Sequence, residues 1–234
     1  MFPLKDENPT RRRPIVTYSL IILINTAVFV GTLLAGKFDQ TIMEFGMKPK
    51  EVLAGQQLHT LFTSMFLHGG VLHILSNMWY LWIFGDNIED ILGRWKFILF
   101  YLGAGLAAGI AHSLSDPGSM IPTIGASGAI AAVLGAYMVL YPWANVHTAV
   151  IFFYFIRLIT IPALALIGFW FVLQVLSASV TWMTGVSGGV AYWAHVGGFI
   201  AGLLLILPVW MKLRKRRRRR HVHSSTVWDE PLIR

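Results

Sequence analysis

The sequence predicts an all-α, multi-pass membrane protein whose six transmembrane helices form a bundle with a long first loop. Of its 234 residues, 56% are hydrophobic and only 13% are charged, whereas ordinary soluble domains carry about 25% charged residues. Between Lys96 and Lys212, the only charged residues are Asp116 and Arg157. A water-soluble fold cannot cover so much apolar surface, so most of the chain is expected to lie in a bilayer.

A helix that crosses the hydrocarbon needs about 20 mostly apolar residues. Two segments between the predicted spans are different in character. Residues 37–63 carry scattered charges and the turn-forming "KPKE", which predict a long loop with short interfacial helices. The segment His147–Arg157 is too short to span and is expected to be an interfacial piece that leads into the fifth helix. Six stretches are long enough, at about residues 15–35, 69–85, 95–113, 125–141, 162–182 and 193–211.

The distribution of Lys and Arg predicts the orientation in the membrane. An even number of spans puts both termini on one side. With the termini inside, sixteen of the 19 Lys and Arg residues are inside, and only Lys37, Lys48 and Lys50 are outside. Because positive charge favours the cytoplasmic side, we expect a cytoplasmic N-terminal segment (1–14), a six-span domain (15–211) and a basic cytoplasmic tail (212–234) that is disordered beyond Arg220. A bacterial or archaeal cell membrane is the expected location.

The net charge of +8 comes largely from two blocks, Arg11–Arg13 and Lys212–Arg220. Basic blocks at the ends of spans act as topology signals and contact anionic lipid headgroups, so membrane lipids are expected partners and nucleic acid is not. The chain has no cysteine, which excludes disulfides and thiolate chemistry. The first apolar stretch has no evident small-residue cleavage site, which favours a retained span over a signal peptide.

Three of the predicted spans carry polar residues near the same membrane surface. Ser127 lies in the fourth span and His195 in the sixth, while His73 and Asn77 lie four residues apart on one face of the second. The even-numbered spans all begin at the outer surface, and a rise of 1.5 Å per residue puts these side chains within the outer third of the bilayer. Polar groups at membrane depth are costly, so they indicate a functional site.

Helix packing is the alternative interpretation of these stretches. "GASG" and "GGFIAG" both match small-residue helix contacts, and Gly198 and Gly202 form a GxxxG pair that is expected to pack closely. Ser127 alone would also suit a packing contact, and a single His in a span is often a hydrogen-bonded interior residue. The matched depth of Ser127 and His195, with two further polar residues beside them, favours chemistry.

A serine hydroxyl becomes a nucleophile when a base removes its proton. His195 is the expected base, because His73 is the only other candidate at that depth. No predicted span contains Asp or Glu, so the pair would act as a dyad, without the carboxylate of a triad. Backbone N–H groups at the helix start, Ser127 and Gly128, point toward incoming negative charge, and His73 and Asn77 are suited to complete an oxyanion hole. No metal or cofactor is predicted.

Gly-Ala-Ser-Gly at 125–128, His73-x-x-x-Asn77 and Ala-His195-x-Gly-Gly-x-x-x-Gly together resemble the rhomboid family of intramembrane serine proteases. The order and spacing of the three motifs match over about residues 15–211. The resemblance implies a six-helix rhomboid-like bundle with Ser127 as nucleophile and His195 as general base and acid. It also implies His73 and Asn77 as oxyanion stabilisers beside the Ser127 amide.

The resemblance further implies an endopeptidase that forms an acyl-enzyme and cuts a membrane-anchored protein near the outer face, with water entering through a cavity open to that face. Gly125, Ala126 and Gly128 then provide room for the substrate backbone and the oxyanion. A fifth span that moves sideways to admit substrate is also expected from the family, with Phe169–Gln174 as a lining face.

The sequence departs from the family pattern at two places. The first loop has His59-Thr60 where the family often has Trp-Arg, so its anchoring is expected to differ. Ala131 stands four residues after Ser127, where many members have an aromatic residue that stacks on the catalytic His. His195 is therefore expected to be held by other neighbours.

Other classes of membrane protein remain as alternatives. The chain has no His-Glu-x-x-His motif for a zinc protease and no pair of Asp residues within spans for an aspartyl protease. A small transporter or channel could use a polar pocket without chemistry, but no internal repeat is evident and no predicted span carries an acid. A non-catalytic membrane protein of the same fold is the third hypothesis, and the presence of both Ser127 and His195 argues against it.

Overall fold

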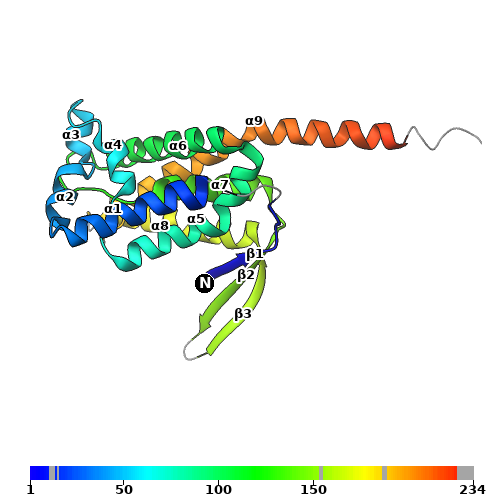
Figure 1. Cartoon of the computed structure of the whole chain (residues 1–234), viewed down its shortest axis with the longest axis horizontal. Helices are drawn as coiled ribbons and strands as arrows, with labels where there is room; N and C mark the ends of the chain where they lie inside the picture. The colour runs from blue at the N-terminus through cyan, green and yellow to red at the C-terminus, as the bar shows by residue number, and fades with distance from the viewer. Residues whose placement is uncertain (11–13, 15, 153–154, 186–188, 226–234) are drawn as a thin grey trace, which may run out of the picture.

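The structure is a computed structural model that describes residues 1–10, 14, 16–152, 155–185 and 189–225. Most of the helices run side by side in a bundle, and a small sheet projects from one end of it (Figure 1). The strands are β1 (Phe2–Asp6), β2 (Asn145–Phe152) and β3 (Phe155–Pro162). The helical elements are η1 (Val16–Ile22), α1 (Leu23–Leu34), α2 (Phe38–Phe45), α3 (Pro49–Leu53), α4 (Thr60–Thr63), η2 (Ser64–Phe66), α5 (Val71–Leu92), α6 (Arg94–Ser115), α7 (Ser127–Leu140), α8 (Ala163–Thr184) and α9 (Tyr192–Ser225).

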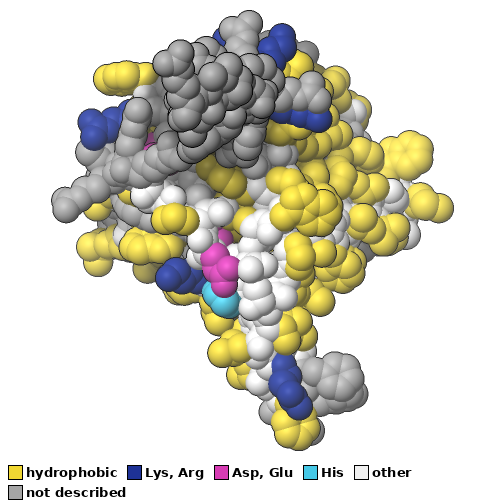
Figure 2. Space-filling model, turned by 90° about the vertical axis from the view of Figure 1, so that its right-hand side faces the viewer, with side chains coloured by type: hydrophobic (Ala, Val, Ile, Leu, Met, Phe, Trp, Pro, Cys, Tyr) yellow, Lys and Arg dark blue, Asp and Glu magenta, His cyan; other side chains and the backbone are white. Residues whose placement is uncertain are grey.

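Three helices of the described part are long and apolar enough to cross a membrane: α6, α8 and the Tyr192–Arg216 part of α9. Two further apolar helices, α1 and α7, are shorter. Helix α5 is as long as α6, at 22 residues, but it carries Asp86, Glu89 and Asp90 in its last turns. Exposed Leu, Val, Ile and Phe side chains cover the outer faces of the helices, as Figure 2 shows on one flank. Apolar outer faces suit helices in lipid, and the chain is a membrane protein.

Helix α7 lies at the centre of the bundle, where every residue from 128 to 137 is buried. Helix α9 runs along it in the same direction, with the two backbones in contact. A Cβ atom at Gly198 would overlap the carbonyl oxygen of Gly128, and one at Gly202 would overlap that of Ala132. Only glycine permits this approach, so these residues set the distance between α7 and α9.

A buried carboxylate fixes the beginning of the first helical segment. Glu89 of α5 is only 3% exposed and accepts hydrogen bonds from the backbone N–H groups of Val16 (3.0 Å) and Thr17 (2.7 Å) and from the Thr17 hydroxyl (2.8 Å). First-turn N–H groups lack intrahelical partners, so Glu89 acts as their cap. Helix α5 thus extends beyond the predicted span 69–85 and includes acidic residues that the prediction placed outside it. Glu89 lies about 24 Å along α5 from His73, far from the predicted site.

The prediction of an all-α chain is wrong in one respect, because the structure includes an antiparallel sheet in the order β1-β2-β3. Strands β2 and β3 form a hairpin in place of the predicted interfacial piece, with Asn145 opposite Pro162. The hairpin is rich in Val, Ile, Thr and Phe, which favour strands. Its third strand comes from the N-terminal segment 1–14, which pairs with residues far away in the sequence, and no local pattern indicates that pairing.

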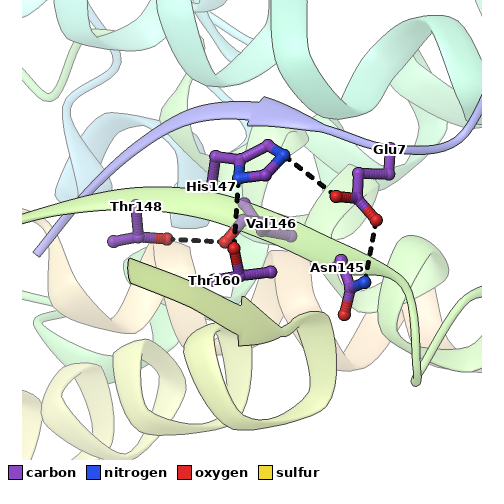
Figure 3. Close-up of polar contacts among 6 residues, drawn as sticks. All are labelled: Glu7, Asn145, Val146, His147, Thr148 and Thr160. Carbon is purple, nitrogen blue, oxygen red and sulfur yellow. Dashed lines mark hydrogen bonds and ion pairs between the residues drawn. The ribbon is translucent and has the colours of Figure 1, made fainter. Parts of the chain in front are cut away.

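Polar contacts join the N-terminal segment to β2 and join β2 to β3 (Figure 3). The Glu7 carboxylate accepts a hydrogen bond from Asn145 Nδ2 (2.8 Å) and lies 3.0 Å from His147 Nε2. The other ring nitrogen of His147 lies 3.1 Å from the Thr160 hydroxyl on β3. These contacts run across the three strands on one face of the sheet.

Asp6 docks the sheet against the bundle. Its Oδ2 atom accepts hydrogen bonds from the Tyr137 hydroxyl of α7 (2.6 Å) and from Asn87 Nδ2 of α5 (3.0 Å). Desolvation by burial raises the pKa of Asp6 above its usual value, and the hydrogen bond from Tyr137 opposes this rise only in part. The ionised form of Asp6 is therefore less stable in the folded protein than in water.

Helix α9 continues past the bundle as a single helix (Figure 1). Its backbone is helical to Ser225, so the disorder predicted beyond Arg220 does not include residues 221–225. Lys and Arg are good helix formers, and the guanidinium of Arg214 lies over the Trp210 ring at 5.2 Å. The basic block Arg11–Arg13 and the last residues, 226–234, lie outside the described residues.

Four short helical elements, α2, α3, α4 and η2, connect α1 to α5. His59 and Thr60, where the first loop departs from the family pattern, both lie in this connection. His59 contacts the Phe45 ring edge-on, with 6.5 Å between centroids. Thr60 is buried, and its hydroxyl donates to the Gln57 carbonyl (2.7 Å). The nearby Thr63 hydroxyl donates to the Phe45 carbonyl (2.8 Å), so Phe45 anchors this part of the connection.

The contact between α7 and α9 predicts that alanine substitutions at two glycines differ sharply in their effect on stability. Gly202→Ala puts a methyl group into the Ala132 carbonyl, so α9 must move away, at a cost of about 1–3 kcal/mol. We expect a fall of several degrees in the midpoint of thermal unfolding in detergent. The control is Gly103→Ala on α6, where a Cβ atom meets nothing within 4 Å. Equal midpoints for the two variants would contradict the assigned contact.

The burial of Asp6 predicts a dependence of stability on pH. Since its pKa is raised in the folded state, the folded form binds the proton more tightly, and stability is greatest below the unfolded pKa and is lost as pH rises through the folded value. Asp6→Asn keeps an oxygen acceptor for Tyr137 and has no charge to desolvate. Measured at increasing pH from the ordinary Asp value of 3.8 upward, the unfolding midpoint of wild type relative to this variant should fall, because the folded-state pKa is raised. A constant difference across that range would rule out the effect.

Candidate active site

The structure brings Ser127 and His195 into direct contact. Ser127 is the first residue of α7, and His195 lies in the first turn of α9. The distance between Ser127 Oγ and His195 Nε2 is 2.8 Å, within the range of a good hydrogen bond. Because α7 and α9 start at the same end of the bundle, the two first turns face each other. A hydroxyl next to an imidazole nitrogen is the arrangement from which a serine can be deprotonated.

The loop before Ser127 is fixed by backbone hydrogen bonds. Met47 and Thr123 exchange two of them, at 3.0 and 2.7 Å, and the N–H of Gly125 donates to the Ser64 carbonyl (2.9 Å). Gly125 has φ +123°, a conformation that side chains rarely allow. The chain therefore turns into α7 at a defined point, which sets where the Ser127 hydroxyl lies.

Gly125 also leaves a space beside the serine. A Cβ atom at this position would lie 2.8 Å from His73 Nε2 and 3.6 Å from Ser127 Oγ. His73 Nδ1 accepts a hydrogen bond from the Gly69 N–H (3.1 Å). A neutral imidazole that accepts at one nitrogen carries its proton on the other, so His73 presents an Nε2–H donor to this space.

The other predicted residues occupy different positions around the site. Asn77 is buried one turn along α5, and its amide donates to the His73 carbonyl (2.8 Å) within the same helix. Gly128 lies against α6 and α9, where a Cβ atom would lie 2.6 Å from that of Ala108. Ala126 is fully buried just before α7. Gly198 and Gly202 lie further along α9, in the backbone contact with α7 described above.

Aromatic residues from two elements surround His195, and the sequence did not single them out for this place. The Trp170 ring of α8 lies 6.0 Å from the imidazole at an interplanar angle of 34°, and the Tyr192 ring contacts it edge-on at 6.4 Å. Ala131, where many relatives have a stacking aromatic residue, is fully buried. The signal in the sequence was the pair Trp170 and Gln174, four apart on α8 and so on one helical face.

The second ring nitrogen of His195 also has a partner. His195 Nδ1 lies 2.7 Å from Gln174 Oε1. Gln174 comes from α8, so three helices contribute to one chain of contacts from Gln174 through His195 to Ser127. From the sequence, Gln174 is expected only as part of the lining face 169–174.

A cavity of about 440 Å³ lies beside the site and shares His73 with it. Its walls come from the start of α5 and the chain before it, the end of α6, the loop before α7, the end of α8 and the start of α9. Among the described residues, no group of three or more His, Asp or Glu side chains is arranged to hold a metal ion. The polar residues of the cavity wall are His73, His112, Ser115, Asp116, Ser119, Thr123, Thr181 and Tyr192.

Comparison with known proteins shows which family the chain is similar to. A family model described as the rhomboid domain matches residues 55–212. Rhomboid protease GluP of Bacillus subtilis is 34% identical over 54% of this chain and 24% of its own length. RHOMBOID-like protein 4 of Arabidopsis thaliana is 32% identical over 68% of this chain and 36% of its own length. The mitochondrial Rhomboid protein 1 of Saccharomyces cerevisiae is 28% identical over 84% of this chain and 54% of its own length.

The chain thus spans between about a quarter and about half the length of these curated relatives. The matched region runs from the connection before α5 to the end of the apolar part of α9, and includes Ser127, His195, His73 and Asn77. Since the family model covers more than half of the chain, the chain belongs to the rhomboid family.

Proposed function

We propose that this protein is an intramembrane serine endopeptidase that uses Ser127 and His195 as a catalytic pair. The observation that carries the proposal is the 2.8 Å contact between Ser127 Oγ and His195 Nε2, made by side chains from two different helices of a membrane bundle. A polar pair of this kind is costly among apolar helices unless it has a use. Membership of a family with protease-named members supports the same reaction.

In the proposed reaction, His195 Nε2 takes the Ser127 hydroxyl proton as Oγ attacks the carbonyl carbon of a peptide bond. A tetrahedral intermediate forms, and its oxygen becomes negative. The imidazolium then gives its proton to the departing amine, which leaves an acyl-enzyme on Ser127. Water, activated by the same imidazole, releases the acid and restores the serine. These steps use side chains, backbone and water, with no cofactor.

The space left by Gly125 is the place we propose for the negative oxygen. The Nε2–H of His73 faces this space, and the first-turn N–H groups of α7 at Ser127 and Gly128 have no intrahelical acceptors. Fixed donors at the position where charge develops are the largest single contribution in many enzymes. Asn77 is the second side-chain donor we propose, after its amide turns away from the His73 carbonyl to which it donates here.

We propose six spans for the bundle, with η1–α1 as the first, α5 as the second and α7 as the fourth, beside α6, α8 and α9. On this topology, the six-span protease domain is 15–211, between a cytoplasmic N-terminal segment (1–14) and a basic cytoplasmic tail (212–234). The 16-to-3 distribution of Lys and Arg puts the Ser127 end of the bundle at the outer face. The polar cavity beside His73 then supplies water from that side.

The substrates we propose are membrane-anchored proteins, cut within or near a transmembrane segment close to the outer face. The helices that contribute to the site have apolar outer sides, for example Phe169 and Val172 of α8, each about half exposed. A soluble peptide would have to leave water to reach this depth, whereas a single-span protein is already there. Contacts between the basic tail and anionic lipid headgroups remain part of the proposal.

A serine-reactive fluorophosphonate probe should label the detergent-purified protein at Ser127, because the His195 imidazole activates that hydroxyl. Labelling and the cleavage of a single-span reporter should disappear in Ser127→Ala and His195→Ala. Ser179→Ala is the matched control, since its hydroxyl donates to the Val175 carbonyl on the exposed side of α8. A folded wild type that neither labels nor cleaves would favour a transporter or a non-catalytic relative.

The proposed oxyanion site predicts that two substitutions on α5 lower kcat by different amounts. His73→Phe removes the donor that already faces the Gly125 space and should lower kcat by about a hundredfold or more. Asn77→Ala should lower kcat less, by about tenfold and at most about a hundredfold, since its amide starts from a bond within its own helix. Ser76→Ala, an exposed neighbour, should leave the rate unchanged. A larger loss with Asn77→Ala than with His73→Phe would reverse the assignment.

A further inference from the structure

We propose that Gln174 is a positioning residue for the base, so that Ser127, His195 and Gln174 form a triad whose third member is a neutral amide. The inference rests on the proposed function and adds a residue from α8 to it. Its starting point is the 2.7 Å contact between Gln174 Oε1 and His195 Nδ1, on the ring side opposite Ser127.

The position of Gln174 in its helix is unusual for a polar side chain. The eleven residues of α8 before it, from Ala163 to Leu173, are all apolar or glycine. An amide with both a donor group and an acceptor is costly at such a place unless it finds partners. Its Oε1 atom has one in the imidazole of His195, so the contact satisfies the acceptor of the amide at this depth.

The inner face of α8 aims Gln174 at α9. Leu166 and Ala178 are buried, and Trp170 and Gln174 complete a row with a spacing of four residues. Trp170 contacts the same imidazole one turn before Gln174. On the other side of the helix, Leu176 is 57% exposed. His195 is therefore held by two side chains of one face of α8, one through ring contact and one through a hydrogen bond.

The contact determines which nitrogen of His195 carries the proton. An amide oxygen has no hydrogen and can only accept, so the nitrogen that faces it must be Nδ1–H. A neutral imidazole has one N–H, and Nε2 is then a free lone pair that faces the Ser127 hydroxyl. The opposite form, with hydrogen on Nε2, would donate to Ser127 and could not take its proton. Gln174 thus selects the form of His195 that can act as a base.

The bond also persists through the proposed step. When Ser127 gives its proton to Nε2 and Oγ bonds to the carbonyl carbon, His195 becomes an imidazolium with hydrogen on both nitrogens. Its Nδ1–H still donates to Gln174 Oε1, and a hydrogen bond from a charged donor is stronger than one from a neutral donor. The amide therefore stabilises the imidazolium without bringing a second charge into the bilayer, which a carboxylate would do. When Nε2 passes its proton to the leaving amine, Nδ1 has kept its own throughout.

Kinetics on a single-span reporter test the role with three variants. Gln174→Met keeps the length of the side chain and removes the acceptor, so kcat should fall by about tenfold to a hundredfold while KM stays within about twofold of wild type. Gln174→Glu keeps an oxygen acceptor and should retain more activity than Gln174→Met. Leu176→Met is the matched control on the exposed side of α8 and should behave as wild type. A rise in KM with unchanged kcat in Gln174→Met would overturn the inference in favour of a substrate-binding role.

A spectroscopic measurement tests the same claim without substrate. In ¹⁵N-histidine-labelled protein, the ring signals of His195 are identified by their loss in His195→Ala. Wild type should show hydrogen on Nδ1, and Gln174→Met should shift the ring toward hydrogen on Nε2. An unchanged Nδ1–H form in a folded Gln174→Met protein would overturn the inference.

Fluorophosphonate labelling separates a failure of this inference from a failure of the proposed function. If wild type does not label at Ser127, the protease proposal fails, and the ring signals still decide whether Gln174 sets the proton on His195. If wild type labels and Gln174→Met labels several times more slowly, the positioning role is supported. Equal labelling rates for the two proteins would contradict it.

Discussion

The backbone contact between α7 and α9 is the constraint on which the site depends. Gly198 and Gly202 allow α9 to lie directly against the carbonyl groups of Gly128 and Ala132. Two parallel helices held at that distance begin side by side, and the first turn of each carries one member of the Ser–His pair. The 2.8 Å contact between Ser127 and His195 is thus a result of the helix packing, since each side chain is only one turn or less from the start of its helix.

The cost of polar groups in a bilayer explains where the other polar residues lie. Glu89 and Asp6 are found at the opposite end of the bundle from Ser127, where each carboxylate accepts several hydrogen bonds. At the Ser127 end, Ser127, His195 and Gln174 are joined in a short chain of contacts that contains no carboxylate. His73 accepts at Nδ1 and His195 has its acceptor partner at Nδ1. Both imidazoles therefore turn Nε2 toward the serine and the Gly125 space, His73 with an N–H donor and His195 with a lone pair.

Much of this arrangement could be predicted from the sequence, because depth in a membrane is a one-dimensional property. The count of residues from the start of each apolar stretch put Ser127, His73 and His195 at one level, and the structure puts them at one end of the bundle. The residues around His195 could not be found in this way. Which face of α8 turns toward α9 depends on packing in three dimensions, so the spacing of Trp170 and Gln174 puts them on one helical face without identifying His195 as their partner.

The sheet was missed for a related reason. Strand pairing joins segments far apart in the chain, and β1 has only five residues, too few for a pattern. The hairpin β2–β3 includes the segment His147–Arg157, whose length indicates only that it cannot span, while its β-branched residues favour strands. The predicted second span ends at residue 85, whereas α5 continues to Leu92. Acidic residues end an apolar stretch but do not end a helix.

The close approach of α7 and α9 has a consequence for how the site can be altered. The glycines at that contact leave no room for a side chain, so the distance between Ser127 and His195 is protected from most substitutions that leave a folded protein. Helix α8 is different, because one face touches the imidazole and the other faces outward, with Leu173 and Leu176 about half exposed. Substitutions in α8 can therefore change the surroundings of His195 while the glycine contact keeps the distance between α7 and α9 constant.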